Sequence, residues 1–128
     1  MELPERRLVS VVDDDESVRE SLPDLVRELG FSAQAFASAD EFVASGSVLA
    51  TDCVILDVAM PGMTGPELQQ ELIRRGHRKK IIFITARVEE TVRRHLVALG
   101  AVACLFKPFS DQDLGAALDA AFSGRRWR

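Results

Sequence analysis

Four short apolar runs and one weakly alternating stretch, residues 31–36, alternate along the chain with five segments whose apolar residues recur at helical spacing. Apolar runs closed by turn residues predict buried strands, and strands that are apolar on both faces are typical of a parallel sheet covered by helices. Repeated alternation of strand and helix therefore predicts an α/β doubly wound fold. The predicted strands cover residues 8–12, 31–36, 53–57, 81–84 and 102–106, and the predicted helices cover residues 17–29, 38–44, 65–75, 88–99 and 110–122.

The length of 128 residues fits one domain, which we assign to residues 1–124, with residues 125–128 as a tail or the start of a linker. The net charge of −4 argues against a stand-alone nucleic-acid binder, whose footprint is a basic patch. No apolar segment approaches the ~20 residues of a membrane span, and residues 1–7 lack the apolar core of a secretion signal. The sequence therefore predicts a cytoplasmic protein without a membrane span.

The first predicted helix contains an unfavourable residue, Pro23. Inside a helix a proline removes a backbone donor and costs ~3 kcal/mol if nothing compensates. A helix that starts late, with Pro23 at its first position, is the alternative. Because Val18 fits the apolar face of the pattern, we expect an early start and a kink. Ser17 and Glu20 have the spacing of a capping box.

Polar residues follow four of the predicted strands at the points where the strands end. They are Asp13 and Asp14, then Asp57, Thr85 and Lys107. Because the carboxyl ends of parallel strands share one edge of the sheet, these side chains are expected to lie close together. Three neighbouring carboxylates repel one another unless a cation joins them, and Mg2+ prefers oxygen ligands of this kind. Lys107 is a point charge suited to a phosphate or to Asp57, and Thr85 offers a hydroxyl donor.

Each of these residues has a simpler interpretation when it is taken alone. An acidic run such as residues 13–16 is more often a negative cap at the start of a helix. Thr85 is an ordinary strand residue, and an isolated lysine is usually solvated. Cys53 and Cys104 are predicted to be buried free thiols, because one intervening strand would hold them ~9–10 Å apart, beyond disulfide reach. His77 and His95 are predicted to lie on the solvated surface.

The complete set of motifs resembles the receiver domain of two-component response regulators. This resemblance implies a three-layer, flavodoxin-like fold whose five parallel strands follow the order 2-1-3-4-5 with five helices. Residues 18–22 and 100–102 look most like receivers that precede a helix-turn-helix output domain. The motifs that carry the resemblance are Val-Val-Asp-Asp-Asp at 11–15, the stretch from Leu56 to Gly65, Ile-Thr-Ala at 84–86 and Lys-Pro-Phe at 107–109.

The resemblance implies a role for each residue of the predicted site. Asp57 accepts a phosphoryl group from a sensor histidine kinase. Asp14 and Asp57 bind Mg2+ directly with the backbone carbonyl of Ala59, Asp13 acts through a bound water, and Mn2+ is an alternative ion. Thr85 and Lys107 hold the phosphoryl oxygens, and the peptide bond between Lys107 and Pro108 is cis.

The same resemblance implies the wider function of the chain. It is a signalling switch that assists its own phosphorylation and dephosphorylation, rather than an enzyme. Its output is the control of transcription, and DNA is contacted only through an output domain that lies outside this chain. A homodimer that forms on phosphorylation is compatible with this function.

The sequence departs from the family pattern at Cys104, and Pro23 is also unusual within the first helix. Cys104 stands three residues before Lys107, where the family usually has an aromatic ring that moves inward on activation. The coupling between site and surface is therefore in question. Ala59 and Arg87 stand at positions that tune the lifetime of the phosphoryl group, and neither is an acid or amide that would position an attacking water. We therefore do not expect fast self-hydrolysis.

Three other functions fit the residues less well. A phosphatase with an aspartyl nucleophile would have a second acid two residues after Asp57, where this chain has Ala59. A nucleotide- or flavin-binding domain would have a glycine-rich phosphate loop, and the sequence contains none of the usual patterns. A receiver-like module that never takes phosphate would not need the complete set of acids, Thr85 and Lys107.

Overall fold

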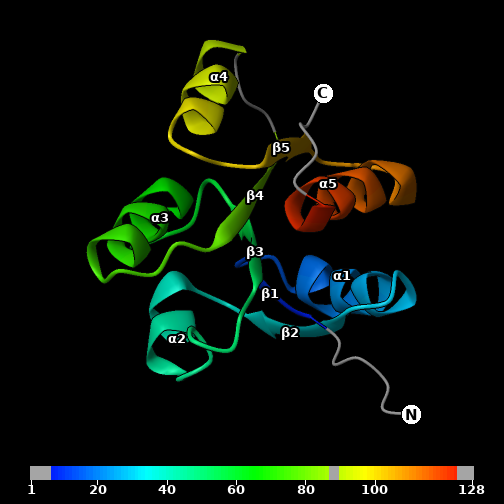
Figure 1. The fold of residues 1–128 in the computed structure, drawn as a ribbon, viewed down its shortest axis with the longest axis horizontal. Coiled ribbons are helices and arrows are strands. Elements are labelled where there is room, and N and C mark those ends of the chain that lie inside the picture. The colour runs from blue at the N-terminus through cyan, green and yellow to red at the C-terminus, as the bar shows by residue number, and fades with distance from the viewer. Residues whose placement is uncertain (1–6, 87–89, 124–128) are drawn as a thin grey trace.

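A computed structural model describes residues 7–86 and 90–123 of the chain. Five parallel strands form one sheet in the order β2-β1-β3-β4-β5, with five helices between and after them (Figure 1). This confirms the predicted fold class and strand order. The elements are β1 (Leu8–Val12), α1 (Glu16–Glu28), β2 (Ser32–Phe36), α2 (Ala39–Ala44), β3 (Cys53–Asp57), α3 (Gly65–Arg74), β4 (Lys80–Thr85), α4 (Glu90–Ala98), β5 (Ala103–Phe106) and α5 (Asp111–Ser123).

Helices cover both faces of the sheet and give the fold three layers. Figure 1 shows α1 and α5 on one side of the strands and α2, α3 and α4 on the other. Successive strand residues point to opposite faces, so the central strands contribute to two separate cores. Ile55 packs in the core beneath α1 and α5, and its neighbour Leu56 packs in the core beneath α2, α3 and α4. Among the described residues, no helix is long and apolar enough to cross a bilayer.

The register of the strands brings their carboxyl ends to one edge. Val12 pairs with Leu56, Asp57 with Ile84, and Thr85 with Phe106. The residues that end β1, β3, β4 and β5 therefore follow one another across that edge. The polar residues at these strand ends are therefore neighbours along one edge, as expected from the sequence.

Helix α1 begins earlier than a start at Pro23 would allow, and it runs through this proline. The late-start alternative is therefore wrong. The predicted capping box of Ser17 and Glu20 is wrong as well, because the N-cap is Asp15. The Asp15 carboxylate accepts hydrogen bonds from the Ser17 backbone amide at 2.9 Å and from the Ser17 hydroxyl at 2.7 Å.

The buried side of α3 also differs from the prediction. The spacing of Leu68, Leu72 and Ile73 predicts that these three form the buried stripe. Leu68 and Leu72 are buried, but Ile73 is 42% exposed. Because the helix starts at Gly65, the face toward the sheet runs through positions 65, 68, 69 and 72. This places the polar residue Gln69 in the interior and turns Ile73 toward solvent.

The last predicted helix pattern before β5 is described only in part. Helix α4 is described from Glu90 to Ala98, and the predicted start at residues 88–89 lies outside the described residues. The spacing of Val92, Leu96 and Leu99 predicts that these residues share one face of the helix. Leu96 is buried, Leu99 follows the end of the helix and is 36% exposed, and the Val92 side chain lies outside the described residues. Arg87 and residues 125–128 also lie outside the described residues.

The two cysteines are buried free thiols, as predicted. Cys53 lies on β3 and Cys104 on β5, and β4 runs between these strands. Burial, and then the charge of Asp52, raise the pKa of the Cys53 thiol to about 12. A thiol with so high a pKa is protonated at neutral pH and behaves as a small apolar side chain.

Candidate functional site

The backbone around Asp57 is tightly packed. Asp57 is the last residue of β3, and the Val58 amide donates to the Ile84 carbonyl at 3.1 Å. The Gly65 amide donates back to the Val58 carbonyl at 3.0 Å, which closes the loop between β3 and α3. A Cβ atom at position 65 would lie 2.3 Å from the Asp57 carbonyl oxygen. No side chain fits there without moving the backbone that carries Asp57.

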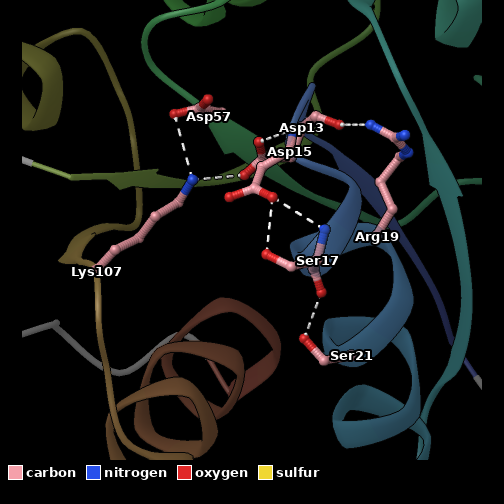
Figure 2. A network of polar contacts seen from close by, with 7 residues as sticks. All are labelled: Asp13, Asp15, Ser17, Arg19, Ser21, Asp57 and Lys107. Carbon is pink, nitrogen blue, oxygen red and sulfur yellow. Dashed lines mark hydrogen bonds and ion pairs between the residues drawn. The ribbon is translucent and has the colours of Figure 1, made fainter.

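The turn after β1 is fixed by hydrogen bonds to Asp13. The Asp13 amide donates to the Phe36 carbonyl at 3.1 Å, and the Asp15 amide donates to the Asp13 carboxylate at 2.9 Å. On the other side, the Arg19 guanidinium donates to the Asp13 carbonyl at 3.1 Å (Figure 2). Asp13 is completely buried. Its carboxylate therefore has a set position at the carboxyl edge of the sheet.

Three carboxylates meet at this edge. Asp13, Asp14 and Asp57 each offer one oxygen, and these oxygens lie within 4.8 Å of one another. Asp13 and Asp57 are buried, whereas Asp14 is exposed. Three hard oxygen ligands with one side open to solvent suit a divalent ion that keeps part of its water shell, as Mg2+ does.

The environment of Asp57 disfavours its charged form. Burial and the neighbouring charges of Asp13 and Asp14 raise the pKa of the Asp57 carboxyl, against the opposing effects of Lys107 and the Ala59 amide, to about 7. The neutral form of Asp57 is therefore favoured far more than for an ordinary aspartate. A cation placed among the three carboxylates would reverse this effect and favour the anion.

Lys107 follows β5 and extends its ammonium between two carboxylates (Figure 2). The Lys107 Nζ lies 2.8 Å from Asp13 Oδ2 and 4.0 Å from Asp57 Oδ1. Burial by itself lowers the pKa of this ammonium, but the hydrogen bond and charge of Asp13, followed by the charge of Asp57, outweigh it and raise the pKa. In this structure the hydrogen-bonded partner of Lys107 is thus Asp13.

Thr85 is the last residue of β4 and lies in the same row of strand ends. It is 4% exposed, and its carbonyl accepts a hydrogen bond from the Lys107 amide at 2.7 Å. This bond connects the ends of β4 and β5. The peptide bond that follows, between Lys107 and Pro108, is cis, as the resemblance implied.

Two polar residues at this edge were not assigned to the site from the sequence. Asp15 caps α1 and lies close enough to Lys107 for their charges to interact. Arg19 lies one turn into α1 and holds the backbone of Asp13. The acidic run at residues 13–16 could have indicated Asp15, because consecutive acids that follow one strand lie at the same edge of the sheet. The role of Arg19 depends on how its side chain turns back, which no sequence pattern indicates.

A doubly wound parallel sheet with three carboxylates and a lysine at its carboxyl edge defines a class of α/β domains suited to hold a divalent ion beside an acidic side chain. The family model of the response regulator receiver domain matches residues 9–119. The chain belongs to this receiver family.

Known proteins of this family resemble the chain over most of its length. It is 41% identical to nodulation protein W of Bradyrhizobium diazoefficiens, over 96% of this chain and 54% of that protein. It is 38% identical to transcriptional regulatory protein FixJ of Azorhizobium caulinodans, over 93% of this chain and 56% of that protein. The solved structure of response regulator StyR matches with a TM-score of 0.81 and 39% identity, over 92% of this chain and 60% of that one. The chain thus spans about half the length of the curated relatives it matches.

Proposed function

We propose that Asp57 accepts a phosphoryl group from the phosphohistidine of a sensor histidine kinase. The observation that carries the proposal is the position of Asp57, in a cluster of three carboxylates and 4.0 Å from the Lys107 ammonium. A carboxylate is a nucleophile that needs no general base. The chain then acts as a switch that takes up and loses a phosphoryl group, and it has no separate substrate to turn over.

In the same proposal, the acidic cluster holds Mg2+, or Mn2+ in its place. Asp14 and Asp57 would hold the ion together with the Ala59 carbonyl, with Asp13 beside it in a supporting role. The open side at Asp14 supports an ion that keeps part of its water shell. When bound, the ion supplies positive charge to the phosphoryl oxygens.

The transfer step needs positioning more than acid–base chemistry. One Asp57 oxygen forms the bond to phosphorus while the bond between phosphorus and the kinase histidine breaks, and the imidazole keeps that electron pair. The Lys107 ammonium and the Thr85 hydroxyl bind the phosphoryl oxygens. Lys107 needs only a small shift for this, because its Nζ already lies between Asp13 and Asp57.

The output of the switch is the control of transcription. This proposal draws on the names of relatives such as transcriptional regulatory protein FixJ, about half of whose length this chain spans. Sequence-specific recognition of DNA then belongs to an output domain outside this chain. Such a regulator works in the cytoplasm, and phosphorylation-dependent pairing of two receivers is one way to bring two output domains together.

Phosphorylation is tested by intact-mass measurement after incubation with acetyl phosphate. We expect the mass of one phosphoryl group to appear on the wild type with MgCl2 and to disappear with EDTA. Asp57→Asn should take up no label, because an amide is not a nucleophile for phosphorus. Glu28→Gln, a change of the same charge at an exposed site on α1, should be labelled like the wild type. Stable labelling of Asp57→Asn, or none of the wild type, would refute the proposal.

A further inference from the structure

A dense group of cations lies at the end of the sheet opposite Asp57. Residues 74–80, which we call the basic turn, connect α3 to β4 and contain five Lys and Arg residues together with His77. With Glu71, these five cations give residues 71–80 a net charge of +4. The whole chain carries −4, so the other residues carry −8. The net charge of the chain therefore conceals a local positive surface.

Most of this charge is available to a partner. The guanidinium groups of Arg74 and Arg75 share a single carboxylate, that of Glu71, and their side chains are 69% and 47% exposed. Arg78 and Lys80 are exposed, and neither side chain makes a hydrogen bond or ion pair with another residue that the structure describes. The nearby Asp52 carboxylate accepts the Leu8 amide at 2.8 Å and so is engaged with the backbone.

The basic turn has an ordered backbone. The Gly76 amide donates to the Ile73 carbonyl at 2.9 Å, and the His77 amide donates to the Leu72 carbonyl at 2.8 Å. Gly76 has a φ of 82°, a conformation that ends the helix and that other residues rarely adopt. The cations are thus presented from a fixed turn between a helix and a strand, which lowers the entropy lost when they engage a partner.

We propose that the basic turn is a phosphate-contacting surface for duplex DNA. Short segments rich in Lys and Arg are typical of nucleic-acid contacts, and interfaces with DNA are far more positive than those between proteins. Protein interfaces are depleted in lysine but enriched in arginine, so the feature that separates the two kinds of partner is the aromatic or other apolar anchor that a protein interface buries. Between Arg74 and Lys80 there is no large apolar side chain. This contact departs from the expectation that DNA is reached only through an output domain. It carries no sequence specificity and adds to recognition by that domain.

An acidic protein segment is the competing partner. Leu49 is 79% exposed, and its carbonyl accepts a hydrogen bond from Lys79 at 3.4 Å. Ile73, directly before the turn, is 42% exposed, so apolar side chains do lie beside the turn. A protein partner would use Leu49 as an anchor. Duplex DNA would contact the cations and leave Leu49 in solvent. The two partners therefore differ in how binding depends on salt and on the density of negative charge.

The test is the binding of a fluorescent duplex of about 20 base pairs by the whole chain, followed by anisotropy at rising KCl concentration. With about four phosphate contacts, a fourfold rise in salt should weaken binding roughly a hundredfold. R78Q/K80Q should bind more weakly, and the slope of log K against log salt should flatten by about 1.8. The control R27Q/R94Q removes the same charge on α1 and α4 and should keep the wild-type slope.

Three results would overturn the proposal. The first is no measurable binding of the duplex at low salt. The second is an unchanged slope for R78Q/K80Q, which would assign the contacts to other cations such as those at residues 125–128. The third is displacement of the duplex by polyglutamate of equal charge as readily as by unlabelled duplex, which would favour an acidic protein. All three are independent of the labelling of Asp57, so the two proposals fail separately.

Discussion

Lys107 lies between two carboxylates at unequal distances, 2.8 Å from Asp13 and 4.0 Å from Asp57. The ammonium therefore already has a partner in this structure, without the phosphoryl group that we propose for Asp57. A phosphoryl oxygen on Asp57 would compete with Asp13 for it, and Asp13 is kept in place by backbone hydrogen bonds. This arrangement ties the state of Asp57 to the ends of β1 and β5.

The pKa of Asp57 leads to a prediction about stability. In the folded protein this pKa is about 7, above its ordinary value of 3.8, so the folded state binds more protons than the unfolded state between these two values. Stability contributed by this group is thus lost as the pH rises from about 4 to about 7. Asp57→Asn, which is always neutral, should raise the free energy of unfolding at pH 8 by about 1–2 kcal/mol.

Urea unfolding without divalent ions, at pH 4.5 and at pH 8, measures this difference. The gain of Asp57→Asn over the wild type should shrink at the lower pH, where the wild-type carboxyl is protonated. Glu28→Gln serves as the control for a lost surface charge and should show no such pH dependence. An equal gain at both pH values would mean that charge repulsion at Asp57 is not its cause.

At Gly65, the addition of a single Cβ atom should disturb the loop that carries Asp57. Gly65→Ala places a Cβ 2.3 Å from the Asp57 carbonyl, so the loop must shift. We expect a loss of about 1–3 kcal/mol in unfolding free energy, together with weaker Mg2+ binding. Gly115→Ala is the matched control, because its Cβ would make an ordinary 3.8 Å contact with Leu29. That change should stabilise α5 by about 0.5–1 kcal/mol. Equal effects of the two changes in urea unfolding would show that the clash with the Asp57 carbonyl is not the cause.

At the level of elements, helix α3 begins directly beside the site. Thr64 caps it, and the Glu67 amide donates to the Thr64 hydroxyl at 3.3 Å while the Glu67 carboxylate accepts the Thr64 amide at 3.0 Å. The cap and the close contact at Gly65 together set where the loop from Asp57 joins the helix. The start of this helix therefore helps to position the site.

Removing the cap should destabilise α3. We expect Thr64→Ala to lower the free energy of unfolding by about 1 kcal/mol, because the Glu67 amide loses its acceptor. Thr64→Ser keeps the hydroxyl and should recover most of the loss. Urea unfolding of the three proteins checks this. If the serine variant were as unstable as the alanine variant, packing of the threonine methyl group would be the cause.

The helices and strands also show which features of the structure can be predicted from the sequence and which cannot. Four of the strands and their polar ends were predictable because apolar runs closed by turn residues are strong local signals, and the edge strand β2 was predictable from its weaker alternation. The cap at Asp15 and the burial of Gln69 were not, since each depends on the residue at which a helix begins. The pairing of Lys107 with Asp13 depends on the path of a long side chain. Cys104 is buried under α4 with Leu96, so the aromatic ring usual in the family is replaced by a smaller apolar group.

For the whole molecule, an ion at the acidic cluster should act as a stabiliser. A ligand that binds only the folded state adds about 1.4 kcal/mol at ten times its Kd. We therefore expect MgCl2 to raise the melting temperature of the wild type by several degrees, and EDTA to reverse this. Asp14→Asn removes one of the clustered carboxylates and should lose most of the shift, whereas Glu28→Gln should keep it. Equal shifts in all three proteins would point to ions bound elsewhere.

The parallel sheet separates two kinds of charge by the length of its strands, roughly 20 Å for six residues. Carboxylates gather where the strands end, and the basic turn leads into the start of β4. A body charged in this way has a preferred orientation next to a polyanion. If it lies on DNA by its basic end, the Asp57 edge faces away from the duplex. In the proposed function, a kinase could then phosphorylate Asp57 again while the protein stays bound to the DNA.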